Sequence, residues 1–94
     1  MSNADENILT AEVTVQDRRG LHLRLASEIV RKCAGFASEI LVTARDSAKT
    51  VSAKSTLGLM ALAAPFGTRL TVAVKGADAP AAMQALKDAF AISR

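Results

Sequence analysis

Residues 9–35 have the sequence LTAEVTVQDRRGLHLRLASEIVRKCAG, and the chain changes from a strand pattern to a helix pattern within them. Residues 9–16 alternate apolar and polar side chains and are rich in β-branched residues, which is typical of a half-buried strand. Residues 17–20 end this alternation and predict a turn. From residue 23 to about residue 34 the spacing is that of an amphipathic helix. Its predicted core face consists of Ala26, Ile29, Val30 and Cys33.

The remainder of the chain continues with both element types. Apolar spacing predicts, in chain order, strands at 39–45 and 50–53, a helix at 56–64, a strand at 69–75 and a helix at 79–92. We expect Asp78 to N-cap the last helix, which should bury Met83, Leu86 and Phe90. The order β-α-β-β-α-β-α predicts an α+β fold, in which helices cover one face of an antiparallel sheet and the other face meets water.

The length of 94 residues predicts one domain spanning residues 1–94, with a disordered tail at residues 1–6. Half of the residues are hydrophobic, which suits a globular chain and excludes a disordered one. With three Phe and neither Trp nor Tyr, the core has to be built mainly from aliphatic side chains.

Composition and charge argue against several function classes. The twelve basic residues are scattered and no stacking aromatics accompany them, so a nucleic-acid-binding domain is not expected despite the net charge of +3. One Cys and one His cannot supply the four ligands of a structural zinc site, and we expect no metal. No apolar run reaches transmembrane length, so no membrane insertion is expected. The single Cys33 cannot form an internal disulfide, which favours a cytoplasmic location.

The only histidine of the chain stands at the entrance of the first predicted helix. His22 falls at the N-cap, after Gly20, which lets the backbone come close to a ligand. Arg24 lies in the first turn, where a cation opposes the helix dipole unless an anion is bound there. An imidazole at this place can attack phosphorus and hold a transferable phosphoryl group. The spacing alone leaves a second interpretation open, in which His22 is an ordinary surface histidine.

A second region of interest begins at Ser55, a good N-cap residue for the helix predicted at 56–64. Helical spacing places Leu59, Leu62 and Ala63 toward the core. Leu57 and Met60 then point away from the core and should be exposed. This exposed pair is either a docking patch or two unrelated surface residues. A phosphate on Ser55 would lie at a helix N-terminus and would oppose docking beside it.

The motifs GLHLRLA (20–26), GFASEI (35–40) and VSAKSTLGLMAL (51–62) together resemble the HPr family, the histidine-containing phosphocarriers of the bacterial phosphoenolpyruvate:sugar phosphotransferase system. The resemblance spans roughly residues 9–90. It implies an open-faced β-sandwich, with a four-stranded antiparallel sheet and three helices on one face. It also implies a monomeric carrier that is not an enzyme and needs no cofactor.

The resemblance further implies roles for individual residues. His22 would be phosphorylated on Nδ1 by enzyme I and would pass the group to enzyme IIA domains, with Arg24 stabilising the phosphate. Ser55 would be the target of an HPr kinase/phosphorylase in catabolite regulation. The partner-docking residues would be Leu23, Thr56, Leu57 and Met60.

Leu25 departs from the family motif, which usually has proline at this position. Two functions therefore stay open: a carrier in a sugar transport chain, or a regulatory binding module that is switched by phosphorylation of Ser55 and docks to a transcription regulator.

Overall fold

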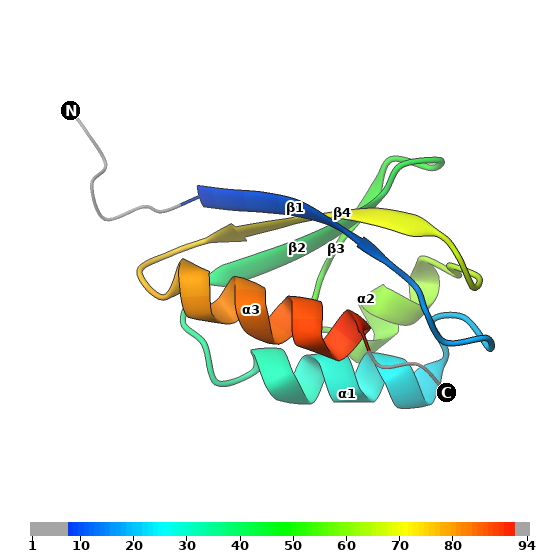
Figure 1. The fold of residues 1–94 in the computed structure, drawn as a ribbon, viewed down its shortest axis with the longest axis horizontal. Helices are drawn as coiled ribbons and strands as arrows, with labels where there is room; N and C mark the ends of the chain where they lie inside the picture. Colours follow the sequence, from blue (N-terminus) through cyan, green and yellow to red (C-terminus); the bar gives the residue numbers. More distant parts are fainter. Residues whose placement is uncertain (1–7, 92–94) are drawn as a thin grey trace.

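Seven elements follow one another in the predicted order in the computed structural model, which describes residues 8–91. They are β1 (Ile8–Thr14), α1 (Leu23–Cys33), β2 (Glu39–Ala44), β3 (Lys49–Ser52), α2 (Thr56–Ala61), β4 (Arg69–Lys75) and α3 (Ala79–Phe90). Figure 1 shows the sheet as one layer and the three helices as a second layer on one of its faces. The α+β fold expected from the sequence is confirmed. The tail expected at residues 1–6 lies outside the described residues.

The sheet is antiparallel throughout, with the strand order β1-β4-β2-β3. Val72 of β4 lies opposite Ala11 of β1 on one side and opposite Val42 of β2 on the other. β2 and β3, which correspond to the strands predicted at 39–45 and 50–53, pair as an antiparallel hairpin. Because successive residues of a strand point to opposite faces, alternate apolar residues of each strand turn toward the helices. In β4 these residues are Leu70, Val72 and Val74, and all three are fully buried.

One hydrophobic core fills the space between the sheet and the helices. Its largest fully buried apolar side chains are Phe90, Ile29, Ile40, Leu59, Leu70 and Leu86. They come from two strands and from all three helices, so every layer contributes to the same core. Complete burial of a side chain of this size contributes about 1.5–3 kcal/mol to folding. The predicted burial of Met83, Leu86 and Phe90 is confirmed.

The helix predicted at 56–64 is shorter than expected. α2 ends at Ala61, and two residues later Ala63 takes a left-handed conformation with a φ of 50°. The helical spacing therefore stops before Ala63. As a result Ala63, which we expected in the core, is exposed, whereas Ala64 is buried in its place.

Asp78 lies at the N-cap of α3, but its side chain makes no capping hydrogen bond, contrary to the prediction. Its carboxylate instead accepts the backbone N–H groups of Ala37 at 2.8 Å and Ser38 at 2.9 Å, together with the Ser38 hydroxyl. Asp78 thus links the loop after α1 to the loop after β4. α3 ends at Phe90, and residue 92, its expected last residue, lies outside the described residues.

Among residues 8–91, no helix combines the length and the apolar character that crossing a bilayer requires.

Candidate functional site

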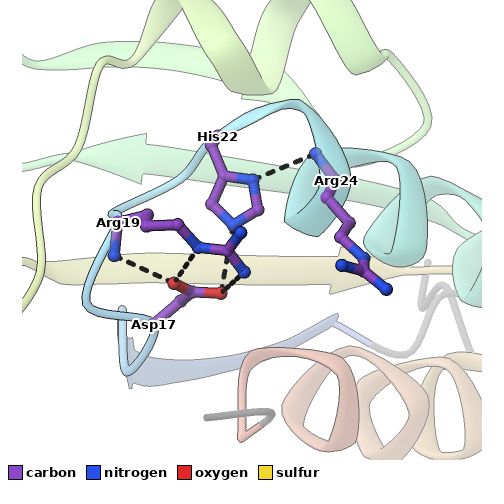
Figure 2. Close-up of polar contacts among 4 residues, drawn as sticks. All are labelled: Asp17, Arg19, His22 and Arg24. Atoms are coloured by element: carbon purple, nitrogen blue, oxygen red, sulfur yellow. Dashed lines mark hydrogen bonds and ion pairs between the residues drawn. The ribbon is translucent and has the colours of Figure 1, made fainter. Parts of the chain in front are cut away.

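His22 lies at the N-cap of α1, as predicted. Its backbone is extended (φ −89°, ψ 178°), and its carbonyl accepts a hydrogen bond from the Ala26 N–H at 2.9 Å. The ring turns back toward the helix, so that Nδ1 accepts the Arg24 N–H at 3.1 Å (Figure 2). The side chain remains 22% exposed. Nδ1 is therefore the ring nitrogen that faces the helix N-terminus, where unpaired N–H groups favour an anion.

The turn before His22 is packed against the chain that leaves α2. Gly20 has a φ of +78°, and a Cβ at this position would lie 2.8 Å from the backbone oxygen of Ala64. The same oxygen accepts the N–H of Leu21 at 2.8 Å. Only glycine allows both the left-handed conformation and this close approach. Figure 1 shows α2 beside the N-terminal part of α1. The position of His22 thus depends on two elements and not on α1 alone.

A buried carboxylate holds the other ring nitrogen of His22. Oδ2 of Asp17 lies 3.0 Å from Nε2, and Asp17 is only 2% exposed. Oδ1 accepts the backbone N–H of Arg19 at 2.9 Å and its Nε–H at 3.3 Å (Figure 2). The Arg19 backbone N–H, followed by the His22 ring, holds the pKa of Asp17 well below its usual range. Asp17 is therefore ionised whenever the protein is folded near neutral pH.

Asp17 and Arg19 were not among the site residues predicted from the sequence, which placed them in a plain turn. That interpretation was correct for the backbone, because the Arg19 N–H bonds a side-chain oxygen of Asp17 two residues earlier, as in many turns. The second carboxylate oxygen reaches His22, five residues further along. A carboxylate that shares a turn with the only histidine was the signal available in the sequence.

Arg24 contacts the His22 ring through its backbone N–H and not through its side chain. Figure 2 shows the guanidinium of Arg24 apart from the imidazole, on the flank of α1. The residue is exposed, and within residues 8–91 its guanidinium has no hydrogen bond or ion pair. The structure thus brings together His22, Asp17 and the Arg24 N–H, and leaves the Arg24 guanidinium in solvent.

Ser55 N-caps α2, as expected, and its Oγ accepts the Gly58 N–H at 2.9 Å. The apolar residues predicted to be exposed are exposed, with Leu57 at 82% and Met60 at 38%. Leu23, at the start of α1, is 57% exposed. Two neighbouring helices therefore present apolar side chains to solvent at the end of the molecule where His22 lies.

In the part of the chain that the structure describes, no group of three or more His, Cys, Asp or Glu residues is placed to hold a metal ion.

Comparisons with known proteins cover nearly the whole chain. A family model described as the PTS HPr component phosphorylation site matches residues 9–91. The phosphocarrier protein HPr of Xylella fastidiosa (strain Temecula1) is 37% identical over 83 residues, or 88% of this chain and 91% of that protein.

Solved structures are similar over the same length. The crystal structure of a phosphocarrier protein HPr from Bacillus anthracis has a TM-score of 0.80 and 33% identity, covering 87% of this chain and 95% of that one. The solution structure of Crh, the Bacillus subtilis catabolite repression HPr, has a TM-score of 0.62 and 32% identity over 87% of this chain and 95% of that one.

Proposed function

Because the chain belongs to the HPr family of phosphocarriers of the phosphotransferase system, we propose that His22 is the residue that carries its phosphoryl group. As a member of that family, the chain is a carrier protein and not an enzyme. One observation supports His22 above all. Its Nδ1 accepts a hydrogen bond from the first turn of α1, so this nitrogen has a lone pair that faces a helix N-terminus.

The transfer step is a nucleophilic substitution at phosphorus. The Nδ1 lone pair forms the N–P bond, and the bond from phosphorus to the donor breaks, with its electron pair leaving on the donor. The Arg24 N–H, which contacts Nδ1 in the resting protein, is placed to donate to a phosphoryl oxygen instead. Onward transfer reverses these steps at an acceptor.

Arg24 is proposed to stabilise the phosphoryl group through its side chain as well. Its guanidinium is exposed, lies on the first turn of α1 and has no partner within residues 8–91. A rotation of the side chain about its own bonds would bring this fork of N–H donors to the phosphoryl oxygens, which it can bind in a bidentate manner. Arg24 would therefore act only after the group has arrived.

The partners of the carrier are phosphotransfer proteins of the same system. We propose enzyme I as the donor and enzyme IIA domains as acceptors. The docking surface consists of Leu23, Thr56, Leu57 and Met60. Leu57 is the most exposed of its large apolar residues at 82%, and a partner that covers it would remove this apolar area from water. We also propose that the chain acts as a monomer in the cytoplasm.

A regulatory role is the second candidate, and one contact favours it. The Ser55 Oγ lies at the N-terminus of α2, within one turn of Leu57. A phosphate there would add about two negative charges beside the docking surface and would oppose apolar docking. Crh, which is similar over most of its length, is described as a catabolite repression protein. An HPr kinase/phosphorylase would be the modifying enzyme, and a transcription regulator would be the partner.

The assignment of His22 is tested by labelling with phosphoenolpyruvate and enzyme I. We expect intact mass to show one added phosphate that is lost in acid and kept in base, as for a phosphohistidine. His22→Ala should take up none, while circular dichroism shows that the variant is folded. Persistent labelling of His22→Ala would contradict the assignment.

A further inference from the structure

We propose that Asp17 is a positioning residue for His22: it holds the ring proton on Nε2, which directs the phosphoryl group to Nδ1, and it stabilises the ring when transfer makes it cationic. This inference rests on the proposed role of His22 as the phosphoryl acceptor. It adds a residue that the motif around the histidine does not contain, because Asp17 lies five positions before His22 and on the other side of Gly20.

The contact between the two side chains is direct and sheltered. Oδ2 of Asp17 lies 3.0 Å from Nε2 of His22, within ordinary hydrogen-bond range. Asp17 is 2% exposed, so water does not compete freely for this oxygen. The remaining oxygen, Oδ1, is occupied by the backbone and side chain of Arg19. The carboxylate therefore cannot turn away from the ring without breaking several hydrogen bonds at once.

Both ring contacts select the same tautomer. An ionised carboxylate only accepts hydrogen bonds, so Nε2 has to carry a proton to bond Asp17. A backbone N–H only donates, so Nδ1 has to carry a lone pair to bond Arg24. In a neutral imidazole one nitrogen is a donor and the other an acceptor, and these two neighbours assign the roles. The nucleophilic lone pair is thus already on Nδ1 before a partner binds.

The same arrangement protects Nε2 from phosphorylation. An incoming phosphoryl group carries negative charge, and at Nε2 it would meet the Asp17 carboxylate at hydrogen-bond distance. At Nδ1 it would meet the N-terminus of α1, which favours anions. The two ring nitrogens therefore differ in protonation and also in the charge that surrounds them.

Transfer leaves a charge on the ring that Asp17 can stabilise. Nδ1 gives its lone pair to phosphorus while Nε2 keeps its proton, so the phosphorylated ring is formally cationic and the donor leaves with the electron pair of the broken bond. The Asp17 carboxylate, bonded to that proton, lowers the energy of the cationic ring and of the transition state before it. Arg19 opposes part of this effect, because its guanidinium shares the carboxylate.

Asp17→Asn is the direct test, because the amide keeps the size of the side chain but can donate to Nε2. ¹⁵N shifts of the ring should move from the Nε2–H tautomer toward the Nδ1–H tautomer. The initial rate of phosphorylation by enzyme I should fall at least about 10- to 100-fold, the loss that follows when the carboxylate partner of a metal-bound histidine is removed. NMR of the phosphorylated variant should also show some phosphate on Nε2.

Two control variants show whether an effect of Asp17→Asn comes from its contact with His22. One removes a carboxylate charge elsewhere, and the other removes side-chain hydrogen bonds within the same turn. Asp88→Asn makes the same chemical change at an exposed carboxylate whose one hydrogen-bond partner among residues 8–91 is Gln84, and it should alter neither the tautomer nor the rate. Arg19→Ala removes the side-chain bonds of Arg19 to Asp17 but leaves its backbone bond, and it should keep the Nε2–H tautomer.

The unaltered protein supplies a measurement that does not depend on the folding of a variant. Its ring ¹⁵N shifts should show the proton on Nε2, and a proton on Nδ1 would overturn the inference. An unchanged tautomer, rate and phosphorylation site in Asp17→Asn would also overturn it, while leaving His22 as the acceptor. Labelling that persists in His22→Ala would instead refute the proposed function itself, so the two failures are distinguishable.

Discussion

Gly20, Asp17 and His22 decide the site at the scale of single residues. Gly20 brings the turn against the Ala64 oxygen, Asp17 fills the inside of that turn with a buried charge, and His22 closes it at the start of α1. Each of the three residues contacts other parts of the folded chain. Small changes at these positions should therefore change both stability and the geometry of the ring.

Gly20→Ala should destabilise the protein by more than about 1 kcal/mol, because alanine disfavours positive φ and its Cβ would lie 2.8 Å from the Ala64 oxygen. Urea unfolding measures this loss. Gly67→Ala is the matched control, since Gly67 also has a positive φ (88°) but a Cβ there would meet open space. We expect Gly20→Ala to be the more destabilised of the two and to shift the His22 ring resonances. Equal losses would show that the contact with Ala64 is unimportant.

Two carboxylates should make stability depend on acid. The pKa of Asp17 is lowered from its ordinary 3.8 chiefly by the Arg19 N–H, and that of Asp78 is lowered chiefly by the Ser38 hydroxyl. A carboxylate with a lower pKa in the folded state contributes stability above its unfolded value and loses it as the pH falls through the folded value. The contribution of these two carboxylates to the free energy of unfolding should therefore be constant near neutral pH and should decrease as the pH drops below about 3.8.

Urea unfolding between pH 7 and pH 2 measures this dependence. The double variant Asp17→Asn/Asp78→Asn should be less stable at pH 7 and should lose less on acidification, because its two amides do not titrate. An acid loss as steep as that of the unaltered protein would assign the dependence to other groups.

Local sequence was sufficient to place His22 and Ser55 at helix N-caps, because capping depends on a few neighbouring residues. It was insufficient for Asp17 and Asp78. Each has two oxygens, and the partners of those oxygens include residues on another loop or on the far side of a turn. A carboxylate's choice among such partners depends on tertiary packing, which a single sequence does not display.

At the scale of elements, α2 depends most on local capping. It is six residues long and has no acidic residue in its first turn, so the Ser55 cap is a large part of what stabilises that turn. The predicted end of this helix was wrong because helical spacing continues in the sequence after the backbone has turned at Ala63.

Ser55→Ala should cost about 1 kcal/mol of stability, the usual loss when an N-cap hydroxyl is removed. Thermal or urea unfolding measures it. Ser55→Asp is the matched control, because aspartate also caps helices and should retain most of the stability. If Ser55 is also the regulatory site, ATP and an HPr kinase/phosphorylase should add an acid-stable label that Ser55→Ala lacks. If Ser55→Ala unfolds at the same urea concentration or temperature as the unaltered protein, the capping role of Ser55 is contradicted.

At the scale of the whole molecule, the proposed acceptor His22 and the proposed docking surface belong to one end of the helical layer, where α1 begins and α2 lies beside it (Figure 1). The element order and the period-2 and helical patterns predicted the layers, because burial on one face determines both. The contact between the His22 turn and the exit of α2 could not be predicted, because it joins residues more than forty positions apart.

Leu57→Glu should slow phosphorylation by enzyme I by about tenfold, because it places a charge on an apolar contact. Stability should hardly change, since Leu57 is 82% exposed. Ile8→Glu is the control: Ile8 is also exposed, at 59%, but it lies at the start of β1, at the opposite end of the sheet in Figure 1. Initial rates with limiting carrier measure the effect. Equal rates for both variants would remove Leu57 from the docking surface.

The complete burial of Cys33 has a practical consequence for following the carrier in solution. Its thiol lies on the buried face of α1, in the hydrophobic core, and burial raises its pKa, so little reactive thiolate is available. The native chain should therefore be nearly inert to maleimide dyes. A cysteine introduced at Thr50, an exposed residue of β3, would take up a single fluorophore and report the tumbling of the carrier as it passes between donor and acceptor.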